Sequence, residues 1–210
     1  MVTERRQFLR GLGTATVVGL AGCSGDGTDG SEGSPTTTES PTDDPGGTRP
    51  EGTGGPGVTL VSVDDEVGLP VEPAVEVVRE AATEEHPPRF ETALSNTSDE
   101  SVRVGEGRAV HFEYVRDDAE ALVLLPPDGE YPAEPGCWRL TDGVAVTEEY
   151  RTFEIAAGET SRRPVDLYAT PGEDACLPVG EYRFETTLSI VSADAEPESS
   201  AQWGFTILLE

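Results

Sequence analysis

Short runs of apolar and β-branched residues, separated by turn residues, recur from Val58 to the end of the chain. Between Glu181 and Val191, the side chains that suit a core alternate with polar ones, the period of two expected of a strand with one buried face. Many short runs of this kind predict an all-β antiparallel sandwich. The expected strands are Val58–Val63, Arg89–Ser95, Arg108–Val115, Ala121–Leu125, Tyr150–Ile155, Arg163–Ala169, Glu181–Val191 and Gln202–Leu209.

Residues 74–85 fit two structures. A helix over this range would have one apolar face, with Pro73 at its start and the pair Pro87 and Pro88 forcing it to stop. A strand is favoured by three β-branched residues, Val75, Val77 and Val78. We expect a strand from about Ala74 to Arg79 followed by an irregular loop, with the helix as the alternative.

Residues 24–57 differ in composition from the rest of the chain. They are almost wholly Gly, Ser, Thr, Pro, Asp and Glu, without an aromatic or aliphatic residue. Such a segment cannot bury enough apolar surface to offset the entropy lost on ordering. We therefore expect a disordered acidic tether over residues 23–57 and one folded domain over residues 58–210.

The chain is strongly acidic. It has 41 Asp and Glu against 14 basic residues, a formal net charge of −27, and all the basic residues are Arg. This self-repulsion largely disappears at about 1 M salt, where the screening length is about 3 Å. Because the acids are spread along the chain, the composition favours a halophilic protein over an acidic tail or a dedicated cation-binding protein. Nucleic acid is not expected as a partner, since phosphate contacts require basic patches.

The amino terminus resembles a twin-arginine export signal. Arg10 stands where the pattern usually has Lys, and Glu4 where Ser or Thr is usual. The apolar stretch Gly11–Gly22 is too short to span a bilayer as a stable helix, so residues 1–22 are expected to be a cleaved signal peptide. The residues that match the pattern are Arg5, Arg6, Phe8 and Leu9.

A second signal follows at once. Leu20, Ala21 and Gly22 precede Cys23, and this sequence resembles a lipobox, in which the cysteine thiol takes a lipid as a thioether. The alternative is an accidental cysteine after an ordinary signal. We expect a covalent lipid on Cys23 to hold the protein on the outer, extracellular face of the cell membrane.

The two other cysteines, Cys137 and Cys176, are expected to form a disulfide in an oxidising exterior. Two buried free thiols or two metal ligands are the alternatives. Since a twin-arginine substrate crosses the membrane folded, the fold must bring the two Cα atoms close together before oxidation.

The sequence contains no recognisable catalytic site. A blue-copper centre needs two His, a Cys and usually a Met, but only His86 and His111 are present and the single Met is Met1. Zinc would need clustered ligands, and neither His lies in a nucleophile motif. We expect no catalytic residue, metal or cofactor. Three acidic clusters suit solvated strand ends better than calcium or acid–base sites: Asp64–Glu66, Asp117–Asp118 and Glu148–Glu149.

Asn96 begins the triplet Asn96-Thr97-Ser98, which is an acceptor pattern for N-glycosylation. An ordinary Asx turn would also place an Asn here, and both interpretations stay open. Trp138 and Trp203 are expected to pack in the core or over the disulfide.

Several short segments spread over the domain carry a resemblance to a known family. They are Val77–Ala82, Arg89-Phe90, Leu94–Asp99, Leu124–Pro126, Cys137–Arg139, Ala157–Thr160, Cys176–Phe184 and Trp203–Phe205. Through them the domain resembles uncharacterised haloarchaeal surface lipoproteins over nearly its whole length. That resemblance implies an immunoglobulin-like fold and a surface location, without an assigned activity. A weaker similarity, through the Asn-Thr turn and the Gly-x-Tyr-x-Phe hairpin, links it to BsuPI-like proteinase inhibitors.

The leading hypothesis is a non-enzymatic interaction or envelope-structural module, with an unknown surface protein or envelope component as its partner. A proteinase inhibitor is the first alternative and would present an exposed loop. An unrecognised enzyme is the second and would need a pocket in which His86 or His111 lies beside a carboxylate.

Overall fold

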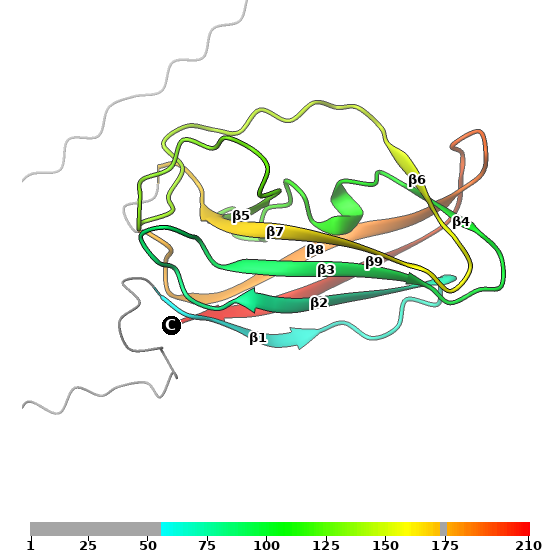
Figure 1. Ribbon diagram of the computed structural model, residues 1–210, viewed down its shortest axis with the longest axis horizontal. Helices are drawn as coiled ribbons and strands as arrows, with labels where there is room; N and C mark the ends of the chain where they lie inside the picture. Colours follow the sequence, from blue (N-terminus) through cyan, green and yellow to red (C-terminus); the bar gives the residue numbers. More distant parts are fainter. Residues whose placement is uncertain (1–55, 173–175) are drawn as a thin grey trace, which may run out of the picture. The chain divides into compact units, whose positions relative to one another are not determined.

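The computed structural model describes residues 56–172 and 176–210, and their regular secondary structure is almost entirely β-strand. The predicted signal peptide, Cys23 and nearly all of the predicted tether lie outside them. The all-β prediction is confirmed, since every strand pair is antiparallel. The elements are β1 (Val58–Val63), β2 (Val71–Arg79), β3 (Arg89–Asn96), β4 (Val102–Gly105), the 3-10 turn η1 (Ala109–His111), β5 (Leu122–Leu125), β6 (Thr152–Ile155), β7 (Thr160–Ala169), β8 (Gly180–Val191) and β9 (Pro197–Leu209) (Figure 1).

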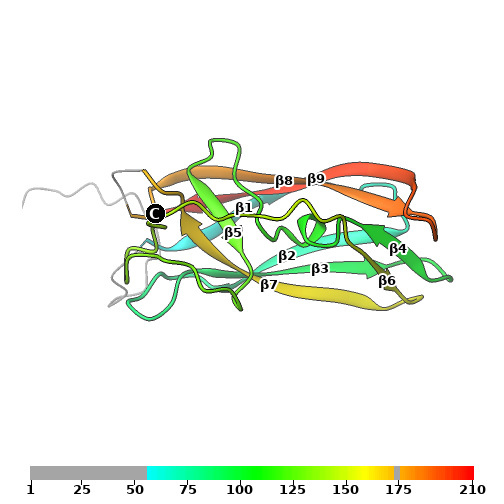
Figure 2. The ribbon, with the colours of Figure 1, turned by 90° about the horizontal axis from the view of Figure 1, so that it is seen from above.

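The strands form two sheets, with orders β1-β9-β8-β4-β6 and β2-β3-β7-β5. Figure 2 shows them as two layers, with β8 and β9 in one and β3 and β7 in the other. In an immunoglobulin-type sandwich one sheet has the order A-B-E-D and the other contains G-F-C. Here β2-β3-β7 take the places of A-B-E, and β9-β8-β4 those of G-F-C. The predicted immunoglobulin-like sandwich is confirmed, although β5, in the place of D, precedes β6 in the chain.

Phenylalanine rings from both sheets meet in the core between the layers. The ring of Phe205 on β9 lies 5.6 Å from that of Phe184 on β8 and 5.9 Å from that of Phe90 on β3, measured between centroids. All three side chains are fully buried. The alternation predicted for β8 is also confirmed, because Phe184, Leu188 and Ile190 point inward and Glu181 and Thr187 are exposed.

The strand expected at Arg108–Val115 is a wrong prediction. This segment contains the short turn η1 and then two residues with left-handed backbone, Phe112 with φ 58° and Tyr114 with φ 67°. Val110 and Phe112, whose alternation suggested a strand, are buried as part of the core, but the backbone that carries them is irregular. The strand that does occur nearby is β4, Val102–Gly105, which we did not expect.

The ambiguous segment is a strand. β2 pairs with β3 from Val71 to Arg79, so the helix alternative is wrong. Pro73 lies within β2, which is an edge strand of its sheet, and an edge position tolerates a residue without an N–H group.

The first described residues and the carboxyl terminus lie at the same end of the sandwich (Figure 1). Gly57 and Glu210 exchange backbone hydrogen bonds of 2.8 and 3.1 Å. The turns at residues 97–101, 156–159 and 192–196 lie at the opposite end. Among the described residues, no helix has the length and apolar character that a bilayer crossing requires.

Candidate functional site

Cys137 and Cys176 form the predicted disulfide, with Cα atoms 4.7 Å apart. The bond does not join the two sheets through the core. It links the long connection between β5 and β6 to the connection between β7 and β8. Trp138 packs beside it, edge-on to Tyr168, and donates a 2.7 Å hydrogen bond to the carbonyl of Thr83. The disulfide therefore fastens these two connections to each other, and Trp138 ties the β5–β6 connection to the loop between β2 and β3.

Trp203 is part of the core, as expected. Its side chain is 2 % exposed and meets the ring of Phe112 edge-on at 5.8 Å. The indole N–H donates to the backbone carbonyl of Asp64 at 3.2 Å.

His111 is completely buried in a network of hydroxyl groups. Its Nδ1 lies 3.0 Å from Thr92 Oγ1, and its Nε2 lies 3.0 Å from Ser161 Oγ. Thr92 Oγ1 donates to the backbone carbonyls of His111 and Arg163, at 3.2 and 3.1 Å. Because that hydroxyl has one proton, we assign the Nδ1–H tautomer, in which Nε2 accepts from Ser161.

The surroundings of His111 keep it neutral. Burial, assisted by the positive charge of Arg163, lowers the pKa of His111 to about 3. Its ring hydrogen bonds go to hydroxyl groups and to no carboxylate. A general base would need a pKa near the working pH, so this arrangement suits a structural histidine.

His86 lies apart from His111, in the exposed loop after β2. Its backbone N–H donates to Thr83 Oγ1 at 3.0 Å and closes a local turn. Within residues 56–172 and 176–210, no group of three or more His, Cys, Asp or Glu side chains could hold a metal ion.

The Asn96 side chain is buried and forms an Asx turn. Its Oδ1 accepts a 2.9 Å hydrogen bond from the backbone N–H of Ser98. Its Nδ2 faces the carbonyl oxygens of Glu100, Ile155 and Ala156 at 2.7, 2.9 and 3.1 Å. The amide oxygen and nitrogen of Asn96 therefore both have hydrogen-bond partners within the fold, and they tie the β3–β4 turn to the end of β6.

The acidic clusters play separate roles at strand ends. Asp64 forms a bidentate ion pair with Arg183, which lowers the pKa of Asp64 below its usual value. Asp117 is buried and accepts 2.8 and 2.6 Å hydrogen bonds from the backbone N–H groups of Ala119 and Leu122. Glu149 is exposed and pairs with Arg151. Asp117 therefore departs from the expected solvated strand end, because it shapes the turn before β5.

Almost every arginine in the described part of the chain has an assigned partner. Of the ten present, eight form ion pairs with Asp or Glu. Arg79 donates to the carbonyl of Pro87 at 2.9 Å. Within the described residues, the side chain of Arg116 alone has neither an ion pair nor a hydrogen bond, although the chain has an excess of carboxylates.

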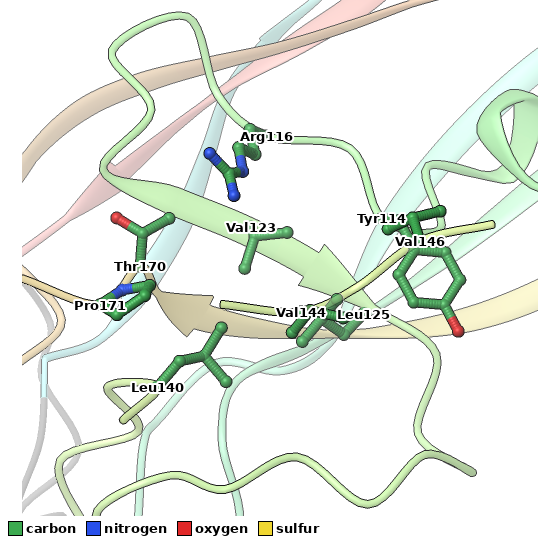
Figure 3. Close-up of a pocket in the computed structure, with 9 residues that line it drawn as sticks. All are labelled: Tyr114, Arg116, Val123, Leu125, Leu140, Val144, Val146, Thr170 and Pro171. Atoms are coloured by element: carbon green, nitrogen blue, oxygen red, sulfur yellow. The ribbon is translucent and has the colours of Figure 1, made fainter. Parts of the chain in front are cut away.

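A small cavity lies beside Arg116 (Figure 3). Its volume is about 40 Å³, room for about three water molecules. Tyr114 and Thr170 also contribute to it, but the Thr170 hydroxyl already donates to the carbonyls of Glu120 and Ala121. The apolar lining comes from Val123, Leu125, Leu140, Val144, Val146 and Pro171.

Nothing in the sequence indicates this cavity. Its walls come from β5, from residues 140–146 and from residues 170–171, which are far apart in the sequence. Arg116 is followed by Asp117 and Asp118, so the sequence gives no sign that it lacks a partner. Searches with this chain find no matching protein-family model and no matching curated protein.

Proposed function

We propose that this protein is a lipid-anchored surface protein of a halophilic archaeon, exported folded through the twin-arginine route. Its sandwich serves as a non-enzymatic interaction or envelope-structural module. The signal-like residues Arg5 and Arg6, the lipobox ending at Cys23 and the net charge of −27 support this assignment. Kinship with the haloarchaeal lipoproteins that the sequence resembles is part of the proposal.

The placement of residue 56 is the observation that carries the proposal of an interaction module. Pro56 lies beside the carboxyl terminus, and its carbonyl accepts a hydrogen bond from Ala82. A chain anchored through Cys23 would reach the sandwich at this end and present the opposite end to the surroundings. That opposite end has a hollow of about 460 Å³ lined in part by Ser101, Arg103 and Glu198. Loops at one end of an immunoglobulin-type sandwich are a common position for binding.

The anchoring is tested by mass spectrometry of the protein extracted from membranes. We expect a chain that begins at a lipid-modified Cys23. Changing Arg5 and Arg6 to Lys should leave the uncleaved protein in the cytoplasm, and Cys23→Ser should release the protein from the membrane. An intact amino terminus on the native protein in the cytosol would overturn the proposal.

The interaction surface is tested by photo-crosslinking in whole cells at high salt. A crosslinking residue at Ser101, at the end far from residue 56, should capture an envelope component. The matched control is the same residue at Glu84, which is exposed and lies in the β2–β3 loop, where Ala81 pairs with Gly57 at the other end. Equal capture from both positions, or none from either, contradicts the proposed orientation.

A proteinase inhibitor is the second candidate, because the structure contains an exposed and braced loop. Residues 143–151 have no regular secondary structure and are almost all exposed. Arg108 holds this loop by donating to the carbonyls of Thr147 and Glu149, at 2.7 and 3.1 Å. An inhibition assay with secreted proteases at high salt tests this function, and inhibition lost on Arg108→Gln would favour it over the interaction module.

A further inference from the structure

We propose that the cavity beside Arg116 is a binding site for a carboxylate that carries a small branched alkyl group. This site goes beyond the proposed surface role and does not depend on the lipid anchor. The carboxylate is inferred from Arg116, an exposed residue whose guanidinium has no hydrogen bond or ion pair within the described residues and is open to a ligand from solvent. In the same part of the chain, eight other arginines form ion pairs with Asp or Glu.

The backbone places the Arg116 side chain over the apolar lining. Arg116 and Val123 are direct antiparallel neighbours, so their side chains lie on the same face. Leu125 follows Val123 by two residues on β5 and shares that face. Figure 3 shows the guanidinium of Arg116 near Val123, at the margin of the lining. A ligand could therefore place its alkyl group against Val123 and Leu125 and its carboxylate against Arg116.

The dimensions select a small ligand. A volume of about 40 Å³ leaves room for a few water molecules or a small alkyl group and excludes a large one. Leu140, Val144 and Pro171 complete the apolar wall. An alkyl group here would gain roughly 0.8 kcal/mol for each buried methylene, and the planar guanidinium of Arg116 would bind a carboxylate through two hydrogen bonds.

The disulfide joins the two segments that form the outer walls of the cavity. Leu140, Val144 and Val146 follow Cys137 closely, whereas Thr170 and Pro171 precede Cys176. Reduction would remove this covalent link and leave the two segments joined by backbone hydrogen bonds from Leu140 to Ala169 and from Ala169 to Trp138. The site is therefore complete in the oxidised protein, and we expect ligand affinity to fall when Cys137 and Cys176 are reduced.

The test is ligand-observed NMR on the full-length oxidised protein in about 1 M KCl, where long-range repulsion is screened. The probes are 3-methylbutanoate, which represents a free acid, and N-acetyl-leucine, which represents the last residue of a polypeptide. The probe that binds more tightly shows which of the two sources fits the site better. We expect at least one to bind, and Arg116→Gln to weaken its binding about tenfold or more, because a hydrogen bond to a charged group is worth about 1.5–3 kcal/mol. The neutral 3-methylbutanamide should not compete.

The matched control is Arg162→Gln, which removes an exposed arginine from β7 and should leave binding unchanged. No binding by either acid, equal binding by the amide, or an unchanged affinity in Arg116→Gln would overturn the site. An unchanged affinity after reduction, with the fold checked by circular dichroism, would overturn only its dependence on the disulfide.

Discussion

Arg89 on β3 and Asp166 on β7 are direct cross-strand neighbours joined by two hydrogen bonds of 2.6 and 2.8 Å. Asp166 is only 4 % exposed, and the pairing raises the pKa of Arg89 above its usual value. The carboxylate of Asp166 has been removed from water and forms its ion pair with this arginine.

Arg89→Gln should therefore destabilise the domain by about 3 kcal/mol, since it leaves a buried carboxylate without its ionic partner. Arg162→Gln is the control, because Arg162 and Glu91 form a 3.0 Å ion pair on the same sheet that is much more exposed. Its expected cost is below about 1 kcal/mol. Denaturant unfolding at constant salt measures both, and equal losses of stability in the two variants would contradict the distinction.

The strand pattern was predictable wherever one face of a strand is buried. On β8, Phe184 and Leu188 alternate with Arg183 and Glu185, so the sequence shows which face meets the core. On β2 the β-branched valines correctly indicated a strand, although Pro73 was also compatible with the start of a helix.

The failures have a physical cause. Val110 and Phe112 alternate as they would in a strand, but left-handed backbone at Phe112 turns the chain, and no residue type there signals this conformation. β4 was missed because it has only four residues and ends at Gly105. The cavity beside Arg116 could not be predicted from the sequence either. Whether an arginine lacks an ion pair depends on where every neighbouring carboxylate lies in the folded protein.

Stability at low pH should depend on His111. Its pKa is about 3 in the folded protein, and about 6.5 is expected in the unfolded chain. Between these values the unfolded state binds one more proton, so stability falls as the pH falls, by about 1.4 kcal/mol per pH unit from this group. His111→Gln removes the titration and should flatten the stability curve by that slope between about pH 6 and about pH 4.

The measurement is the difference in unfolding free energy between wild type and His111→Gln at several pH values. Taking the difference cancels the carboxylates, including Asp64, whose lowered pKa also reduces stability as the solution is acidified. His111→Asn is a second variant that cannot titrate. If the curves of wild type and both variants ran parallel, His111 would not be buried in its neutral form.

The disulfide should stabilise the fold without being needed to form it. Cys137 and Cys176 are 39 residues apart, and closing such a loop contributes about 4 kcal/mol on the chain-entropy account. The phenylalanine core around Phe205 does not involve either cysteine. Changing both cysteines to Ser should lower the unfolding free energy by about 2–4 kcal/mol and leave the near-ultraviolet circular dichroism native. Wild type in reductant should match this variant, and a reduced chain that fails to fold would contradict folding before export.

Asn96 should be unmodified in the native protein, because its Nδ2 faces three carbonyl oxygens within the fold. Asn96→Asp would place a carboxylate oxygen against those carbonyls and should cost about 3 kcal/mol or more. Ser98→Ala is the matched control: it destroys the acceptor triplet but keeps the Asn96 amide, and should cost about 1 kcal/mol for the lost hydroxyl contacts. Mass spectrometry of peptides from the surface protein should find Asn96 without a glycan. A sugar mass on the wild-type peptide that disappears in Ser98→Ala would show that Asn96 is modified before the domain folds.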